Sequence, residues 1–272
     1  VRHIYNQYTK IWKGDKGMME FDGVIYGPVR SRRLGLSLGV NLLPRENKVC
    51  TFECVYCECG FRKKGVAGRM PSREEVRRSV EEALEGLAKR GERLDVITFA
   101  GNGEPTMHPD FEGVLEDTMR ARDRWQGEAK ISVLSNATML GRESVRRGLM
   151  MADNNILKLD SAIDETARAI DAPWSGDYSV ERVVEQMGMF GGDFVLQTMM
   201  LRGEVDGRRI DNTTEAEAEA WRAIVRRLRP RQTMVYSIDR ETPVRTLEKV
   251  GKEEMERIVR PLREEGFDVL VV

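Results

Sequence analysis

Short apolar runs alternate with amphipathic segments along most of the chain, and this alternation limits the possible folds more than any other feature. Seven runs have the length and aliphatic content of buried strands: 34–40, 94–101, 130–137, 155–162, 193–201, 232–238 and 267–272. Six segments carry apolar residues at helical spacing: 72–91, 109–125, 141–152, 179–190, 214–228 and 253–266. Six strand–helix pairs followed by a last strand predict parallel βαβ units, and hence an α/β fold of the partial (β/α)6 TIM-like barrel type.

Two of the expected helices carry local signals at their ends. Ser72 and Glu75 have the spacing of a capping box at the start of the helix over 72–91, and Gly91 can end it. Pro261 lies inside the last expected helix, and we expect it to kink or end that helix because proline cannot donate the helical hydrogen bond.

The composition is that of a globular protein without a dominant charge. Of the 272 residues 40% are hydrophobic, and 44 basic residues face 45 acidic ones for a net charge of −1. This balance provides no global attraction to nucleic acid, although the local run Arg30, Arg32 and Arg33 is either a solvated surface or a phosphate contact. We expect one barrel domain over residues 24–272, preceded by an N-terminal extension over residues 1–23.

The sequence gives no sign of a membrane partner. No apolar run approaches the roughly 20 residues that span a bilayer. The first residues also lack the apolar core of a signal peptide. We therefore expect a cytoplasmic protein in a reducing environment, where clustered cysteines are more often metal ligands or catalytic groups than disulfides.

All four cysteines of the chain stand in the stretch NKVCTFECVYCECG, at positions 50, 54, 57 and 59. A zinc site usually takes its ligands as two separated pairs, so four thiolates this close together would strain the loop. Structural cysteines without a ligand are usually scattered. Short, uneven spacings instead suit the separated corners of an iron–sulfur cluster, which is the interpretation we favour over these two alternatives.

The spacing Cys50-x3-Cys54-x2-Cys57 resembles the signature loop of the radical S-adenosylmethionine (SAM) superfamily. The resemblance implies that these three cysteines bind a [4Fe–4S] cluster whose fourth iron binds the amino and carboxylate groups of SAM. It also implies that Tyr56 lies by the adenine of SAM. Cys59 is then a bystander near the cluster rather than a fourth ligand. The predicted six-unit barrel agrees with the fold of this superfamily.

The segment GNGEP follows the next expected strand and is similar to the GGEP motif of the same superfamily. The resemblance implies that its backbone, over Gly101, Asn102, Gly103, Glu104 and Pro105, receives the methionine amino group of SAM. Glycine suits such a position because the backbone must approach the ligand closely. Asn102 departs from the second glycine that is commoner in the motif.

Other polar residues follow the expected strands and should meet at one edge of the sheet. Ser135 and Asn136 are candidates for binding the ribose or carboxylate of SAM, with an Asx turn or a helix cap as the alternative. Gln197 is a candidate SAM contact or a buried amide that is satisfied within the core.

Four further residues are candidates for binding the substrate. Lys158 and Asp160 alternate with apolar neighbours, so they point to one face, which in a barrel can be the interior. Asp239 and Arg240 follow the strand over 232–238 and either bind substrate or form a structural salt bridge.

Residues 26–44, together with TFAGNGEPTMHPDF and SIDRETP, resemble the radical SAM group related to wyosine synthase, an enzyme of tRNA-base modification. The resemblance implies an oxidoreductase or lyase that cleaves SAM reductively to a 5′-deoxyadenosyl radical, with an electron from a donor such as flavodoxin or ferredoxin. The radical would abstract hydrogen from a nucleoside, a tRNA base or another small molecule. No cysteine precedes Cys50, so the second, three-cysteine cluster of archaeal wyosine synthases cannot form within these residues.

Two other functions stay open at this point. A glycyl-radical-enzyme activase also manages with one cluster, and it would act on a partner protein. A non-catalytic module that binds zinc or a cluster would need no substrate. The sequence does not indicate the identity of the substrate or the oligomeric state.

Overall fold

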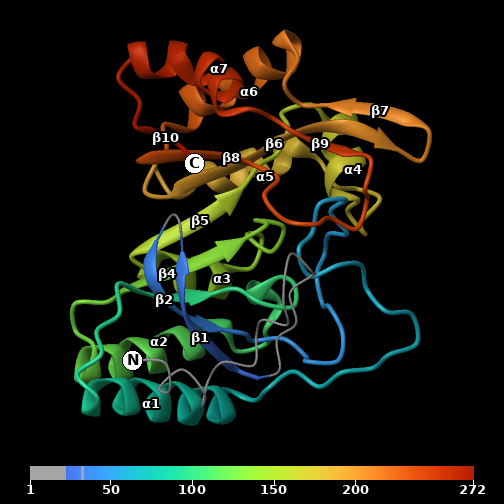
Figure 1. Ribbon diagram of the computed structural model, residues 1–272. Helices are drawn as coiled ribbons and strands as arrows, with labels where there is room; N and C mark the ends of the chain where they lie inside the picture. The colour runs from blue at the N-terminus through green and yellow to red at the C-terminus, as the bar shows by residue number, and fades with distance from the viewer. Residues whose placement is uncertain (1–22, 32–33) are drawn as a thin grey trace. The chain divides into compact units, whose positions relative to one another are not determined.

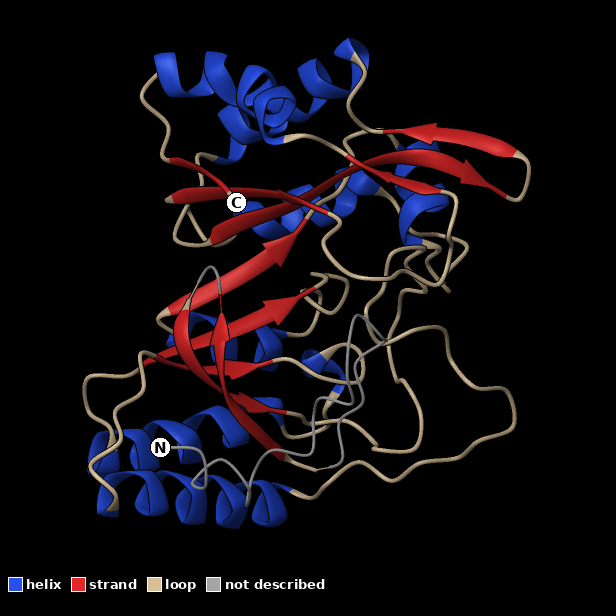
Figure 2. Cartoon of the chain, viewed as in Figure 1, coloured by secondary structure: helices blue, strands red, loops and turns tan. Residues whose placement is uncertain are grey.

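The computed structural model describes residues 23–31 and 34–272 (Figures 1 and 2). Nearly all of the predicted N-terminal extension, and Arg32 and Arg33, lie outside the described residues. The chain forms two compact units, which are described separately. The first contains residues up to 50, 62–135 and 141–155, and the second contains 51–61, 136–140 and 156–272. The cysteine loop is thus divided, with Cys50 in the first unit and the other three cysteines in the second.

The first unit contains a four-stranded sheet and helices that pack against one another, α1 against α2 and α2 against α3. Its strands are β1 (Ile25–Ser31), β2 (Gly35–Val40), β3 (Val96–Phe99) and β4 (Lys130–Ser135). Strand β1 is antiparallel to β2, whereas β2, β3 and β4 are parallel. The helices are α1 (Arg73–Lys89), the 3-10 helix η1 (Pro105–Met107), α2 (Phe111–Trp125) and α3 (Glu143–Met151). Figure 1 shows α1 and α2 side by side, and a salt bridge of 2.6 Å joins Arg73 Nε to Asp117 Oδ2 across them.

The second unit contains a parallel sheet that continues into an antiparallel one. Strands β5 (Asn154–Lys158, in this unit from residue 156), β6 (Val195–Val205), β8 (Gln232–Ser237) and β10 (Val269–Val271) are parallel. Strands β7 (Arg208–Asp211) and β9 (Leu247–Lys249) pair with the far end of β6 in antiparallel fashion. Figure 2 shows β6 running on from the parallel strands into its hairpin with β7.

Four helices belong to this second unit: α4 (Asp164–Asp171), α5 (Val180–Gly188), α6 (Glu215–Leu228) and α7 (Lys252–Glu264). Helix α6 packs against α7, and α7 packs against β10 (Figure 1). Each helix buries one apolar face; in α6 that face contains Trp221, Val225 and Leu228. Burial of such faces supplies most of the stability of short helices, which are marginal alone in water.

The fold class predicted from the strand–helix alternation is confirmed as an α/β fold with parallel strands. The capping box is also confirmed, since Ser72 Oγ accepts from Glu75 N and the Glu75 side chain accepts from Ser72 N. Pro261 does not end its helix, because α7 continues to Glu264, and the expected alternative of a kink stays a prediction. Pro261 lies in the last turn, and the buried residues Ile258 and Leu262 keep the helix packed there. No helix in the described ranges is long and apolar enough to cross a membrane.

The capping box gives a test of how α1 begins. Replacing Ser72 with alanine removes the side-chain acceptor for Glu75 N, so we expect the free energy of unfolding to fall by about 1 kcal/mol. Ser79→Ala is the matched control, because Ser79 lies inside the same helix and alanine is the better helix former there. Urea unfolding measures both; equal stability of the two variants would contradict a stabilising role of the cap.

Candidate functional site

The cysteine loop is fixed by its backbone to the end of α4 and to the segment that follows it. Glu53 N donates to Asp171 O at 2.9 Å, and Val55 N donates to Ile170 O at 2.9 Å. Phe52 and Pro173 form an isolated antiparallel β-bridge. Next to this bridge, Trp174 N donates to Thr51 O at 3.0 Å. Residues 51–55 therefore have a defined path that does not depend on any thiol.

The remaining cysteines follow in two tight turns. Cys57 N donates to Cys54 O at 3.0 Å, and Gly60 N donates to Cys57 O at 2.9 Å. All four cysteines of the loop carry thiols rather than disulfides, and all are partly exposed. Thiolates are the ligands that iron–sulfur clusters use, so this donor set fits the predicted [4Fe–4S] group. In the described part of the chain no three His, Cys, Asp or Glu side chains surround a position for a single metal ion, whereas a cluster binds each thiolate through a different iron.

In the first unit, the GNGEP loop runs directly beside the residue that precedes Cys50. Val49 N donates to Asn102 O at 2.8 Å, and Glu104 N donates to Val49 O at 3.0 Å. Gly103 lies between these bonds with φ of +130°, and a Cβ there would stand 1.9 Å from Val49 O. Only glycine fits this position, because both the backbone angle and the close approach exclude a side chain.

The side chains of this loop serve the loop itself. Asn102 Nδ2 donates to Pro44 O at 2.9 Å and to Arg45 O at 3.3 Å, so the residue that departs from the GGEP pattern fastens an earlier segment. Glu104 is buried, and its Oε1 accepts from Thr106 N at 3.1 Å at the start of η1. Pro105 is the first residue of η1. What the loop offers a ligand is accordingly its backbone rather than its side chains.

The two residues at the end of β4 differ in their surroundings. Ser135 is the buried last residue of β4 in the first unit. Asn136, in the second unit, forms the alternative Asx turn, in which Oδ1 accepts from Thr138 N at 3.1 Å. Its Nδ2 donates to Thr51 Oγ1 at 2.8 Å, which ties this turn to the cysteine loop.

A buried charged group lies against Cys54 in the second unit; we call Lys158, Asp160, Asp171 and Tyr56 the Lys158 cluster. Lys158 Nζ lies 3.0 Å from Cys54 Sγ and 3.2 Å from Asp160 Oδ2, and it also contacts Asp171 Oδ1. The side chains are 13% exposed for Lys158, 0% for Asp160 and 2% for Asp171. Charges this deeply buried must be paired with one another, which is the arrangement observed.

Tyr56 completes this cluster through its hydroxyl group. The hydroxyl donates to Asp160 Oδ2, and the other carboxylate oxygen accepts from Met199 N at 2.9 Å. Burial, and then the negative charge of Asp160, raise the pKa of Tyr56 well above its ordinary value, so the hydroxyl keeps its proton. The aromatic ring predicted to lie by adenine is therefore held in place from its polar end.

The opposing charges also shift the pKa values of the basic and acidic groups. Burial acts to lower the pKa of Lys158, but the charges of Asp160 and Asp171 outweigh it and raise the pKa well above its ordinary value. Burial raises the pKa of Asp171 to about 7, against the opposing charge of Lys158. Lys158 is accordingly an ammonium group at neutral pH.

Gln197 lies beside Lys158 in the neighbouring strand. The two residues are register partners of the parallel pair β5 and β6, and Gln197 is buried. Its role as a SAM contact stays a prediction.

Asp239 and Arg240 lie apart from the Lys158 cluster and form ion pairs of their own. Arg240 Nη1 lies 2.7 Å from Glu58 Oε2, and Asp239 Oδ1 lies 3.3 Å from Lys249 Nζ. These contacts match the salt-bridge alternative for both residues. The pair with Glu58 connects the segment after β8 to the turn that contains Cys59.

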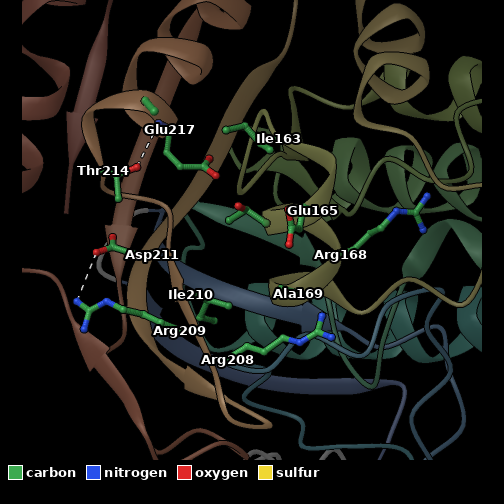
Figure 3. Close-up of a pocket in the computed structure, with 12 residues that line it drawn as sticks. Ile163, Glu165, Arg168, Ala169, Arg208, Arg209, Ile210, Asp211, Thr214 and Glu217 are labelled. Atoms are coloured by element: carbon green, nitrogen blue, oxygen red, sulfur yellow. Dashed lines mark hydrogen bonds and ion pairs between the residues drawn. The ribbon is translucent and has the colours of Figure 1, made fainter.

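A pocket of about 700 Å³ opens between α4, β7 and the start of α6 (Figure 3). Arg168, Arg208 and Arg209 line it together with Glu165 and the buried Glu217. This pocket was not predicted from the sequence, because neither α4 nor the hairpin of β6 and β7 was predicted.

The pocket is connected to the Lys158 cluster through the residue that follows Asp160. Ser161 Oγ donates to Glu217 Oε2 at 2.7 Å at the pocket wall. Asn212, next to the pocket residue Asp211, donates through Nδ2 to Asp160 O at 2.7 Å. One short segment therefore contributes both to the buried cluster and to the wall of the pocket.

Comparison with known proteins defines the class to which this fold and cysteine loop belong. Residues 47–216 match the family model described as the Radical SAM superfamily. This match covers more than half of the chain, and the chain belongs to the radical SAM superfamily. The family predicted from the cysteine loop and GNGEP is thereby confirmed. Members of this superfamily bind a [4Fe–4S] cluster and SAM, which confirms the cofactor prediction at the level of the family.

Individual relatives and solved structures resemble this chain over much of its length. A UPF0026 protein of Methanocaldococcus jannaschii is 33% identical over 184 residues, which cover 65% of this chain and 54% of that protein. The structure of Streptococcus suis SuiB bound to S-adenosylmethionine has a TM-score of 0.59 at 11% identity, over 83% of this chain and 48% of that one. A TYW1 structure with a lysine-pyruvate adduct has a TM-score of 0.57 at 14% identity, over 84% of this chain and 73% of that one. The chain spans between 32% and 58% of the length of the first curated relatives that it matches.

The bond between Tyr56 and Asp160 gives a test of the Lys158 cluster. Tyr56→Phe leaves a buried carboxylate oxygen without its hydroxyl donor, so we expect the free energy of unfolding to fall by about 1–3 kcal/mol. Tyr178→Phe is the control, because burial of Tyr178 is similar but no hydrogen bond of its hydroxyl occurs among the described residues. Equal losses in the two variants, measured by chemical denaturation, would contradict the proposed importance of this bond.

Proposed function

We propose that this chain uses Cys50, Cys54 and Cys57 to bind a [4Fe–4S] cluster, and that bound SAM is cleaved there by one electron to give a 5′-deoxyadenosyl radical for hydrogen abstraction. The observation that carries the proposal is the cysteine loop, whose backbone is fixed at residues 51–55 within a chain of the radical SAM superfamily. A cofactor of this kind supplies the reactive chemistry, while the protein binds, orients and excludes water.

The residues proposed to bind SAM offer mainly backbone groups and aromatic surface. The backbone of 101–105 is kept open by Gly103, and in our proposal it receives the methionine amino group. Tyr56 is proposed to contact the adenine ring. Ser135, Asn136 and Gln197 are proposed to contact the remaining polar groups of SAM; Asn136 already has partners in its own turn, so its contribution would come through water or after rearrangement.

For the substrate, we propose a nucleoside within RNA, such as a tRNA base, whose neighbouring backbone phosphates bind at the pocket of Figure 3. Arg208 is exposed and has no ion pair with any other described residue, and Arg209 lies next to it on β7. Two adjacent arginines at a pocket rim suit phosphate oxygens. The neighbouring Asp160, joined to this pocket through Ser161, is proposed to lie nearest the reacting part of the substrate.

We further propose a one-electron donor of the flavodoxin or ferredoxin type and a cytoplasmic location. Four cysteines that carry thiols suit a reducing compartment, and a low-potential cluster needs such a donor. The runner-up function is a glycyl-radical-enzyme activase, for which the substrate would be a partner protein instead of a nucleoside.

Cysteine replacement tests the assignment of the ligands. Cys50→Ala, Cys54→Ala or Cys57→Ala should each abolish formation of 5′-deoxyadenosine with dithionite and lower the iron content from about four per chain. Cys59→Ala is the matched control and should retain both. Anaerobic purification, iron and sulfide analysis and product chromatography measure the contrast; a colourless wild-type protein with stoichiometric zinc would end the catalytic proposal.

Salt dependence tests the nature of the substrate. If Arg208 and Arg209 each bind one phosphate, the double variant Arg208→Ala/Arg209→Ala should bind RNA more weakly. The slope of log affinity against log salt concentration should become shallower by about 1.4, because each phosphate of a single strand contributes ~0.7. Arg120→Ala, on the exposed surface of α2, is the control. Unchanged binding in the double variant would argue against an RNA phosphate at the pocket, and a co-purifying protein that acquires a glycyl radical would favour the activase.

A further inference from the structure

Three partners within the second unit already surround the Lys158 ammonium group. A lysine ammonium group has three N–H donors. In the second unit its three close partners are Cys54 Sγ at 3.0 Å, Asp160 Oδ2 at 3.2 Å and Asp171 Oδ1. A substrate group would compete with these three partners for the ammonium group. The substrate role expected from the strand pattern is therefore not the role that its contacts favour.

The surroundings of Lys158 direct its charge at the cysteine. The ring of Phe52 lies 4.8 Å from Nζ and the ring of Tyr56 lies 5.1 Å from it, so aromatic groups enclose the ammonium. Both rings belong to the cysteine loop and stand two residues before and two residues after Cys54. Because such an enclosure keeps water away, the ammonium acts on the sulfur with less screening than an exposed lysine would.

We infer that Lys158 is a positioning residue of the iron–sulfur site, which orients Cys54 and stabilises the reduced form of the cluster relative to the oxidised form. This inference rests on the proposed function, in which Cys54 is a cluster ligand. Reduction adds one electron from an external donor and forms or breaks no covalent bond. A cation that donates a hydrogen bond to a ligand sulfur favours the form with the additional negative charge, and hydrogen bonds to sulfur and local charge are known to set cluster potentials.

Asp160 and Asp171 balance the charge of the buried Lys158 ammonium group. An ammonium group that is 13% exposed would be costly without opposing charge, and the two carboxylates provide that charge. The two carboxylates come from different elements: Asp160 follows β5, and Asp171 is the last residue of α4. Asp171 also accepts the main-chain bond from Glu53, so one residue fixes both the loop and the lysine that faces it.

The test is a redox titration of reconstituted protein, followed by electron paramagnetic resonance of the reduced cluster. Lys158→Met retains most of the length of the side chain and removes its charge and donors. At the wild-type midpoint potential we expect the ratio of reduced to oxidised cluster to fall about tenfold, which is ~59 mV for a one-electron couple. Lys158→Arg retains charge and donors and should restore most of the ratio. Lys89→Met, at an exposed lysine of α1, should leave it unchanged.

A second comparison covers the case in which Lys158→Met fails to fold because it leaves Asp171 unpaired. Asp171→Asn and the double variant Lys158→Met/Asp171→Asn are compared with each other, since neither leaves the residue 171 carboxylate buried alone. The double variant should again have the lower midpoint potential. Equal potentials in this pair, or in wild type and Lys158→Met, would overturn the inference.

Iron content separates failure of this inference from failure of the proposed function. Wild-type protein without about four irons per chain would end the proposed function, whatever Lys158 does. Variants with full iron and unchanged potential would overturn only the role of Lys158. If neither methionine variant binds iron while Lys158→Arg does, Lys158 serves to build the site, and the stated effect on potential is wrong.

Discussion

The candidate site of the second unit depends on a short stretch of main-chain pairing between the cysteine loop and the end of α4. The amides of Glu53 and Val55 donate to carbonyls of Asp171 and Ile170, so Cys54 stands between two fixed residues. A loop of thiols is otherwise free to adopt many conformations, and fixing each residue costs roughly 1–2 kcal/mol of backbone entropy. Because the protein meets this cost in folding, the ligand does not have to order these residues on binding.

The same pairing brings oppositely charged side chains to the sulfur. Asp171 contributes its carbonyl to the cysteine loop and its carboxylate to Lys158, while Asp160 accepts from Tyr56 in that loop. The loop and its charged neighbours therefore cannot be changed independently. A substitution in α4 that never contacts the cysteines can still alter them, because the bonds pass through the end of that helix.

The strands and helices of the repeated units could be predicted because each carries its own periodic pattern. The missed elements lack such a pattern: Gly27 and Pro28 interrupt β1, α4 has only eight residues, and β7 and β9 have four and three. The last three of these are stabilised by pairing with β6 or by contacts with the cysteine loop, which are tertiary interactions. Pro261 does not end α7 for a related reason, since burial of Ile258 and Leu262 outweighs the loss of one helical bond.

For the site, the spacing of Cys50, Cys54 and Cys57 and the GNGEP motif could be recognised because they are local in sequence. The sequence also indicated that Lys158 and Asp160 point to one face, and the two side chains do contact each other. It could not show that Asp171 would pair with Lys158 and that Tyr56 would donate to Asp160. Those partners are separated by 13 and 104 residues from the groups they contact, so no local pattern predicts the pairing. The pocket beside α6 was missed for the same reason.

Asn102 of the GNGEP loop makes two separate contacts, one through its backbone and one through its side chain. Its backbone carbonyl accepts from Val49 near the cysteine loop, and its side chain reaches back 58 residues to the carbonyl of Pro44. Glycine at this position would keep the first contact and lose the second, leaving the earlier segment to find another donor. The identity of residue 102 is thus coupled to the conformation of a distant stretch of chain, and the two should change together as such proteins diverge.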